Sequence, residues 1–336
     1  MIVDCAHYRD GARQHEGPMD LDHAASICTA DDGGFVWLGL FEPEPEELAL
    51  VQDRFGLHDL AVEDAQSFHL RPKIEQYDDG AIYFVVLRTA RYVDNREEVE
   101  FGEVSVFMSE RFVITVRQGV GSDLHGSRLR LERRPELLKE GPAAVLWAIL
   151  DKVVDDYAPV VEGVDRDIEE VEATVFGGAV APTERIYGLR REASDFYRAV
   201  HPLLSPLDAI ERGGTYTLIG PALRPFFRDV NDHLKLVDEE VVAQRDLLAV
   251  ILQANMAVIS VEQNQISVAQ NETTKQLTII ATIFLPLTFI TGFFGQNFGW
   301  LTRHIHPFWA FAVYGIGSLI VSSALLYAWF QRRRYF

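Results

Sequence analysis

Seven residues in the C-terminal third of the chain advance by three or four positions and form alternating polar and apolar belts. They are Asn271, Thr274, Leu277, Ala281, Leu285, Thr288 and Gly292. They cover 21 residues in six steps, a mean of 3.5, so they lie along one seam of a left-handed helical bundle. Polar side chains in a membrane span face a partner helix or a water-filled path. The seam therefore predicts an ion path, unless Thr282, Thr288 and Thr291 simply hydrogen-bond their own helix or a neighbour.

A polar triplet, Gly295-Gln296-Asn297, follows the last seam position and ends the apolar span. Such a triplet is either the incidental start of a loop or the mouth of an ion pathway. The long polar and apolar alternation beneath it favours the second interpretation.

Two uncharged stretches, Leu277–Gly295 and Pro307–Phe330, are each long enough to cross a bilayer as a helix. The loop between them is too short for a domain, so we expect a transmembrane hairpin.

The N-terminal residues lack the features of a signal peptide. Lys275 precedes the first stretch and Arg332-Arg333-Arg334 follows the second. Because basic clusters remain cytoplasmic, we expect a multi-pass protein of the inner or plasma membrane with both termini in the cytoplasm.

Charge is divided unevenly along the chain. The net charge is −19, but no acidic residue follows Glu272, so residues 1–275 alone carry −23. This acidity argues against nucleic acid as a partner, and it either attracts cations or keeps the domain soluble. Cys5 and Cys28 predict neither a disulfide framework nor a zinc site. The sequence has no phosphate-binding glycine loop and no nucleophile–base cluster, so we expect neither an enzyme nor an organic cofactor.

The helices and strands that precede the seam in the chain must position it. Residues 34–120 have the pattern of a mixed α/β domain, with an amphipathic helix at Pro45–Phe55 and a turn at 78–80 that supports strand pairing. Apolar or β-branched runs predict strands at 35–40, 81–87, 104–107 and 112–116. Beyond these, Pro142 opens a helical stretch that runs to about Val175, and Pro182 opens a second helix that runs to about Arg212.

A single very long helix is predicted from about 225 to 296, because no glycine occurs between Ala222 and Thr291. At 1.5 Å per residue it would be on the order of 100 Å long. Its polar part carries apolar residues at near-heptad spacing, which a lone helix cannot bury, so we expect oligomerisation. These residues are Leu234, Val237, Val241, Leu248 and Ile251 or Leu252.

The first span and its flanks resemble the CorA family of divalent-cation channels. The resemblance is carried by residues 278–290, by Gly292 and by Phe294-Gly295-Gln296-Asn297-Phe298, with Asn271-Glu272 and Lys275 upstream. Supporting motifs are Phe227-Arg228-Asp229-Val230 with Asp232-His233, Phe55-Gly56-Leu57-His58, Val62-Glu63-Asp64 and Arg71-Pro72-Lys73-Ile74-Glu75. Nearly the whole chain is covered.

The resemblance implies a homopentameric funnel, with the long helices lining the pore and an α+β cytosolic domain, an α/β/α sandwich, around its top. Asn297 would form a ring at the outer mouth, with Gly295 and Gln296 beside it. Thr288 and Asn271 match the inner polar rings, and Leu285 and Leu277 match the apolar belts. Mg²⁺ releases its water reluctantly, and neutral carboxamides hold its hydrated form weakly enough for release.

Several residues depart from the family pattern. Gln296 replaces the usual Met of the triplet, Phe294 replaces Tyr, and Thr274 stands where Met is common. The outer loop lacks acids and carries His304 and His306, which are candidate contacts for a softer metal such as Zn²⁺. A Zn²⁺ transporter of the ZntB type is therefore an alternative. A second alternative is a non-conducting, membrane-anchored sensor or scaffold.

Family members sense cytosolic Mg²⁺ at acidic sites between neighbouring subunits. Asp229 matches the partner on the long helix, and Asp94 is a candidate counterpart on the α/β domain. The resemblance thus implies Mg²⁺ as both transported and regulatory ion, and further copies of the chain, the lipid bilayer and divalent cations as partners.

The expected organisation has seven parts. They are a cytosolic α/β domain (1–141), a helical hairpin packed on it (142–221), the stalk part of the long helix (222–276), a pore-lining transmembrane helix (277–296), an extracytoplasmic loop (297–307), a second transmembrane helix (308–331) and a basic cytosolic tail (332–336).

Overall fold

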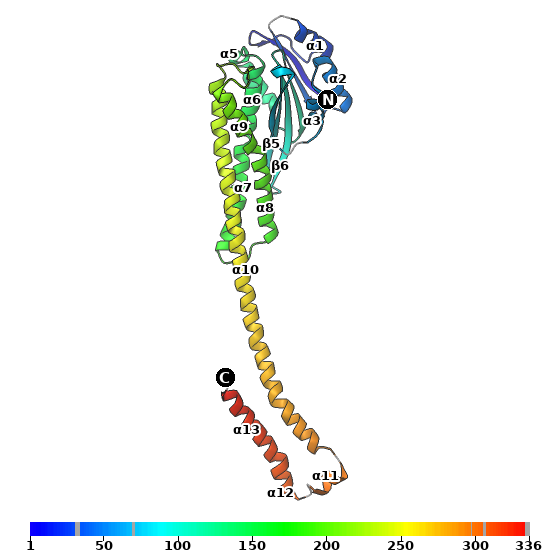
Figure 1. The fold of residues 1–336 in the computed structure, drawn as a ribbon, viewed down its shortest axis with the longest axis vertical. Coiled ribbons are helices and arrows are strands. Elements are labelled where there is room, and N and C mark those ends of the chain that lie inside the picture. Colours follow the sequence, from blue (N-terminus) through cyan, green and yellow to red (C-terminus); the bar gives the residue numbers. More distant parts are fainter. Residues whose placement is uncertain (31–33, 69–70, 297, 305–306, 333–336) are drawn as a thin grey trace. The chain divides into compact units, whose positions relative to one another are not determined.

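The computed structural model describes residues 1–30, 34–68, 71–296, 298–304 and 307–332. The chain divides into two compact units, Met1–Met256 and Ala257–Phe336. One helix of 71 residues, α10 (Arg224–Phe294), contributes to both units (Figure 1). The predicted long helix is thus confirmed, and its observed ends differ from the predicted ones by one or two residues.

A seven-stranded mixed sheet in the order β2-β1-β3-β7-β6-β5-β4 forms the centre of the first unit. β3 pairs parallel with β7, and the other neighbouring strands pair antiparallel. The strands are β1 (Ile2–Arg9), β2 (Ala12–Arg13), β3 (Phe35–Phe41), β4 (Lys73–Tyr77), β5 (Ile82–Val93), β6 (Glu98–Met108) and β7 (Phe112–Gly119). The four strands predicted from apolar runs correspond to β3, β5, β6 and β7.

Both faces of the sheet are buried, as β5 illustrates. Because side chains alternate along a strand, Phe84 and Val86 enter one core and Tyr83, Val85 and Leu87 enter the other. The first core is covered by α1 (Leu21–Thr29), α2 (Pro45–Phe55) and α3 (Asp59–Gln66). The second is covered by α4 (Leu124–Glu132), α5 (Pro135–Leu138), α6 (Pro142–Asp155), α9 (Leu204–Arg212) and the start of α10. The predicted α/β/α sandwich is confirmed (Figure 1).

Two predicted helices are each interrupted. The stretch from Pro142 is two helices, α6 and α7 (Tyr157–Phe176), because Pro159 has no N–H to donate to the carbonyl of Asp155. The stretch after Pro182 is α8 (Thr183–Val200), the 3₁₀ turn η2 (His201–Leu203) and α9, and Pro202 ends the first helix in the same way. A second 3₁₀ turn, η1 (Asp78–Gly80), joins β4 to β5.

The apolar stripe on the first half of α10 is buried within the chain itself. Leu234, Val237 and Val241 belong to the core beneath the sheet, and Leu248 and Ile251 pack with apolar residues of α7 and α8. The prediction that this stripe requires oligomerisation is therefore wrong. Sequence spacing identified the buried face but could not reveal that α7 and α8 cover it.

A polar clamp holds the end of this packed region. The side chain of Asn255, which is fully buried, accepts from the Ala181 N–H at 3.0 Å and donates to the Ala181 carbonyl at 3.1 Å. About three helical turns earlier, the amide of Gln244 donates to the Val161 carbonyl at 3.0 Å and to the Asp165 carboxylate at 2.8 Å. Both clamps fix α10 against the segment that contains α7 and α8.

We expect Asn255→Ala to lower the free energy of unfolding by about 1–3 kcal/mol, because it leaves the buried amide groups of Ala181 without partners. Thermal unfolding of the full-length chain in detergent measures the change. Gln253→Ala, two residues earlier and exposed, is the matched control and should change stability by less than about 0.5 kcal/mol. Equal effects of the two variants would contradict the role of the clamp.

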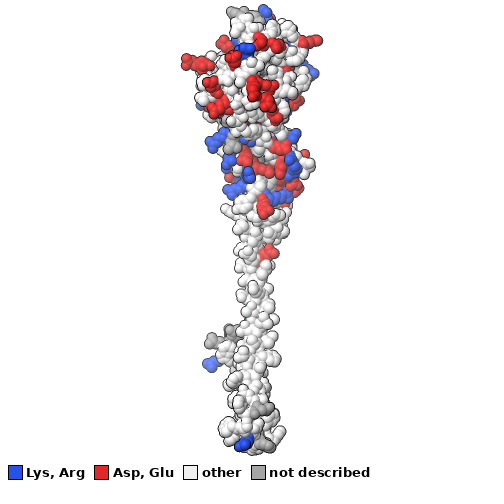
Figure 2. Space-filling model, turned by 90° about the vertical axis from the view of Figure 1, so that its right-hand side faces the viewer, with Lys and Arg blue, Asp and Glu red and all other residues white. Residues whose placement is uncertain are grey.

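The second unit contains the end of α10, then α11 (Gly299–His304), α12 (Phe308–Ala310), a π-helical turn η3 (Phe311–Ile316) and α13 (Gly317–Arg332). Two helices, α10 and the continuous segment Phe308–Arg332, are long and apolar enough to cross a membrane. Acidic and basic side chains gather over the first unit, while the C-terminal half of α10 is almost free of them (Figure 2).

Candidate ion pathway and charged pocket

All seven seam residues lie on α10 within the second unit, and all are exposed in the single chain. Leu277 is 63% exposed and Leu285 is 74% exposed, and the neighbouring Phe284 and Phe289 are 62% and 72% exposed. Successive helical residues are rotated by roughly 100°, so the seven positions occupy one face about 120° wide. The seam is therefore a continuous, uncovered face of the helix.

The opposite face of the same span is partly covered. The half-buried residues between positions 277 and 294 all point away from the seam by helical periodicity. They are Ile279, Thr282, Ile283, Pro286, Leu287, Ile290 and Phe294. The side chains opposite the seam are thus half-buried, whereas those of the seam are open to other molecules.

Hydroxyl groups along the span behave in two ways. Thr274, Thr282 and Thr291 donate to carbonyls one turn earlier, at 2.9, 2.7 and 3.0 Å. Within the described part of the chain, the hydroxyl of Thr288 has no such bond. The intrahelical alternative is therefore correct for Thr282 and Thr291, and the seam residue Thr274 bonds its own helix in the same way. Thr288 keeps its hydroxyl available on the seam.

The triplet after the span is described in part. The N–H of Gly295 donates to the Thr291 carbonyl at 2.9 Å, and the N–H of Gln296 donates to the Phe293 carbonyl at 3.2 Å. The side chain of Gln296 is exposed. Asn297 lies outside the described residues, so its predicted place at the mouth depends on the sequence.

The loop between the two apolar helices has one described histidine. His304 stacks on Trp300 with ring centroids 4.5 Å apart, and its Nδ1 lies 2.8 Å from the Trp300 carbonyl oxygen. His306 lies outside the described residues. Across the described residues, no three His, Cys, Asp or Glu side chains gather as a metal site would require.

The two candidate regulatory carboxylates do not meet within one chain. Asp94, beyond the end of β5, pairs with Arg166 of α7 at 2.9 Å, and both side chains are well exposed. Asp229, in the second turn of α10, instead lines a pocket of about 620 Å³ with carboxylates of α6.

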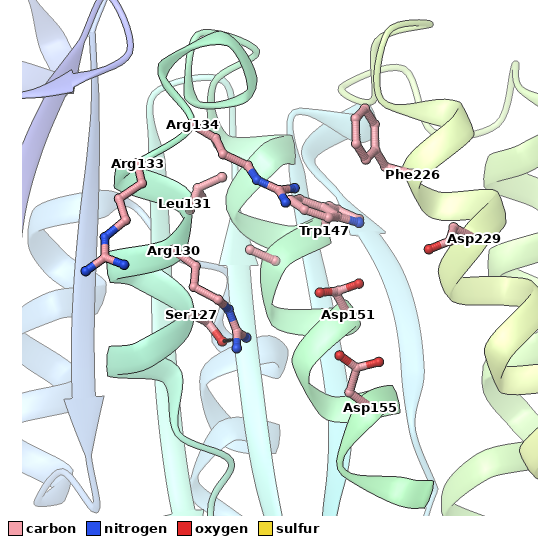
Figure 3. A pocket seen from close by; sticks show the side chains of 11 residues that line it. Ser127, Arg130, Leu131, Arg133, Arg134, Trp147, Asp151, Asp155, Phe226 and Asp229 are labelled. Atoms are coloured by element: carbon pink, nitrogen blue, oxygen red, sulfur yellow. Dashed lines mark hydrogen bonds between the residues drawn. The ribbon is translucent and has the colours of Figure 1, made fainter.

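This charged pocket was not predicted from the sequence (Figure 3). It is lined by Ser127, Arg130, Leu131, Arg133, Arg134, Trp147, Ala148, Asp151, Asp155, Phe226 and Asp229. Burial raises the pKa of Asp151, and the nearby carboxylates of Asp155 and Asp229 raise it further, against the opposing effect of Arg130. Asp151 and Asp155 are one helical turn apart, and this spacing was the only sequence signal for the pocket.

Comparison with known proteins identifies the class. The model of the CorA-like Mg²⁺ transporter protein family matches residues 32–333. The chain belongs to this family, whose members are divalent-cation transporters rather than enzymes.

Individual relatives agree with the family match. The chain is 29% identical over 309 residues to the putative metal ion transporter YfjQ of Bacillus subtilis, covering 91% of each protein. It is 29% identical over 287 residues to the cobalt/magnesium transport protein CorA of Thermotoga maritima, covering 85% of this chain and 78% of that one. The solved CorA magnesium transporter of Methanocaldococcus jannaschii has the same fold, with a TM-score of 0.61, 18% identity and coverage of 99% and 98%.

Proposed function

We propose that this protein is a membrane channel for divalent cations whose main physiological ion is Mg²⁺, with Co²⁺ and Ni²⁺ as further permeant ions. The observation that carries the proposal is the exposed seam from Asn271 to Gly292, opposite a partly covered face of the same helix. The family match and the transport functions named for the relatives support it.

In this proposal five copies of the chain assemble so that the seam of each lines a central pore. The polar side chains of this face, Asn271, Thr274 and Thr288, favour a partner helix or a water-filled path over lipid. Residues 277–296 and 308–331 would cross the inner or plasma membrane, residues 297–307 would lie outside, and residues 1–276 and 332–336 would be cytoplasmic. The first unit would contain the α/β domain (1–141), the helices packed on it (142–221) and most of the stalk (222–276).

The proposed mechanism follows from the chemistry of hydrated Mg²⁺. A ring of Asn297 carboxamides, flanked by Gly295 and Gln296, would accept hydrogen bonds from the water shell without removing it. Thr288 and Asn271 would form further polar rings, and Leu285 and Leu277 would form apolar constrictions between them. The membrane potential would supply about 4.6 kcal/mol per 100 mV for a divalent ion, twice the figure for a single charge.

Regulation by cytosolic Mg²⁺ is proposed at Asp94 and Asp229 across a subunit boundary. The exposed Asp94–Arg166 pair contributes little stability, so a divalent ion can compete for Asp94 at small cost. Mg²⁺ bound between Asp94 of one copy and Asp229 of the next would offset repulsion and favour a closed, symmetric state.

We expect Asp94→Ala and Asp229→Ala each to reduce the protection that Mg²⁺ gives the assembly against proteolysis by at least about threefold. The comparison is the rate of tryptic cleavage in detergent with and without millimolar Mg²⁺. Asp53→Ala, an exposed carboxylate on α2, serves as the control. Protection that is unchanged in both variants would sink the regulatory proposal.

Ion selectivity is tested by comparing Mg²⁺ and Zn²⁺ uptake into liposomes that contain the full-length chain. Because the matching family model and the relative from Thermotoga maritima both carry magnesium transport in their names, we expect Mg²⁺ to enter faster than Zn²⁺. Faster entry of Zn²⁺, lost in a His304→Ala/His306→Ala variant, would favour the zinc alternative. No entry of either ion would favour a sensor or scaffold.

A further inference from the structure

A small pocket lies between the sheet and α4, and it shares no lining residue with the charged pocket. Strands β1, β3 and β7 form one side of it, and α4 and the residue before α4's second position form the other, all within the first unit. Its volume is about 50 Å³, far below the several hundred Å³ of sites for drug-sized ligands. We call it the arginine pocket, and its polar or aromatic lining residues are Asp4, Trp37, Thr115, Arg117, His125 and Arg128.

The alternation of side chains along β7 brings Arg117 to the face of the sheet that α4 helps to cover. Val113 packs in the core on that face, and Arg117, four residues later on the same strand, points to the same side. Arg128 comes from the helix, one turn after Leu124, which packs in the same core. A strand and a helix thus bring two guanidinium groups to one small cavity.

Only one of these two guanidinium groups has an ionic partner among the described residues. Arg128, which is 6% exposed, donates to the carboxylate of Asp4. Asp4 also accepts two bonds from Arg13, at 2.9 and 3.1 Å, so its charge is shared by two arginines. Arg117 is half-buried, and the described chain offers its guanidinium a contact with the ring of Phe41 at 5.4 Å but no hydrogen bond or ion pair. The pocket therefore carries more positive than negative charge.

The two guanidinium groups of the arginine pocket repel each other. Burial lowers the pKa of Arg117, and the charge of Arg128 lowers it further, whereas the charge of Asp123 opposes the shift. The carboxylate of Asp123 is itself engaged as the N-cap of α4, where it accepts from the Gly126 N–H at 3.1 Å. Because arginine keeps its charge at neutral pH, an anion between Arg117 and Arg128 would relieve the repulsion.

Hydrogen-bond donors are also in excess in the wall of this pocket. The Trp37 side chain is 2% exposed and lies against Arg128, whose guanidinium carbon is 4.0 Å from the ring centroid. The indole N–H of Trp37 is buried and has no acceptor among the described residues. His125, exposed in the first turn of α4, adds an imidazole near the positive end of that helix. Because an unpaired buried donor costs free energy, the pocket favours a ligand with several acceptor oxygens.

We propose that the arginine pocket binds a single tetrahedral oxyanion, which is either free phosphate or sulfate or the phosphate group of a small ester. The anion would lie between Arg117 and Arg128, with His125 on its exposed side. Planar guanidinium groups bind two oxygens of such an anion at once. The volume of about 50 Å³ compares with about 30 Å³ for one water molecule, which suits one small anion rather than a polyphosphate or a whole nucleotide. This binding goes beyond the proposed transport function and does not require that the chain conduct ions.

Equilibrium dialysis of the full-length chain in detergent tests the proposal. The probes are labelled inorganic phosphate, labelled sulfate and labelled AMP, with a chelator present so that no metal ion contributes. Sodium chloride keeps the ionic strength equal, because salt screens these contacts. We expect saturable binding of at least one probe. Phosphate or sulfate that binds at least as tightly as AMP assigns the pocket to a free oxyanion, whereas tighter binding of AMP assigns it to a phosphate ester.

Variants of Arg117 locate the binding, because this side chain can be changed without breaking an ion pair of the described chain. Arg117→Gln should weaken binding at least about tenfold, and Arg117→Lys, which keeps the charge but loses the planar fork, should weaken it about threefold. Arg190→Gln, on the exposed face of α8, changes the net charge as Arg117→Gln does and should leave binding unchanged.

Melting temperatures identify any variant that fails to fold. If Arg117→Gln fails to fold, His125→Ala at the exposed start of α4 replaces it, with an expected loss of about threefold. Absence of saturable binding for all three probes, or binding that the folded pocket variants leave unchanged, overturns the proposal whatever the transport assay shows.

Discussion

Replacing Asn297 with alanine is expected to reduce Mg²⁺ flux at least a hundredfold. In the proposed pore the five carboxamides are the groups that accept hydrogen bonds from the hydrated ion, and alanine removes all five at once. An entering Mg²⁺ would then lose the contacts that offset its transfer from bulk water into a narrow mouth. The measurement is the initial rate of Mg²⁺ uptake into liposomes at equal protein incorporation.

Two further variants make the Asn297 result specific. Asn297→Gln keeps the carboxamide and should retain flux within about tenfold of the original chain. Asn95→Ala, in the exposed hairpin between β5 and β6, removes a carboxamide far from the span in sequence and should leave flux unchanged. If Asn297→Ala conducted normally, the triplet would be an ordinary loop start and the mouth would have to be sought elsewhere.

Replacing Leu285 with serine is expected to raise Mg²⁺ flux in high cytosolic Mg²⁺ by at least tenfold. Leu285 is 74% exposed on the seam, and a ring of five such side chains would exclude water from the closed pore. A hydroxyl at this position would keep the constriction wet. Uptake is measured into liposomes preloaded with millimolar Mg²⁺.

Leu287→Ser is the matched control for Leu285→Ser. Leu287 is two residues away and half-buried on the opposite face, so the same substitution there should change stability more than flux. A rise in flux for Leu287→Ser, with none for Leu285→Ser, would mean that the pore is lined by the other face of α10.

Regular patterns in the sequence predicted those helices and strands whose formation depends mainly on residues close together in the chain. Apolar runs identified four strands, and the absence of glycine identified α10 almost to its ends. The interruptions at Pro159 and Pro202 also have a local cause, because proline lacks the N–H that a continuous helix requires. The sequence therefore contains the signal for both breaks.

Other features arise from contacts between distant segments, which no local pattern records. β1 at Ile2–Arg9 has a mixed polar and apolar sequence, and it is a strand because it pairs with β3 along most of its length and with β2 at its end. The stripe at Leu234 and Leu248 has coiled-coil spacing, yet α7 and α8 cover it within the chain. The charged pocket combines residues from three segments around positions 130, 150 and 229, so it became visible only in the folded structure.

The seam is the intermediate case. Its periodicity was visible in the sequence, and the structure added that Leu277, Leu285 and Thr288 are uncovered while Ile283 and Leu287 are not. Phe284 and Phe289 beside the seam are equally uncovered, so the choice of the seam as the pore-lining face stays a prediction. The partner that covers this face in the membrane, proposed to be four further copies, stays a prediction.

The most direct test of the central claim is Mg²⁺ uptake into liposomes that contain only this protein, without ATP, at an inside-negative potential of about 100 mV. The account predicts uptake well above that of protein-free liposomes, increasing with the potential and lost in Asn297→Ala. Uptake of Mg²⁺, Co²⁺, Ni²⁺ and Zn²⁺ no faster than in protein-free liposomes would contradict it.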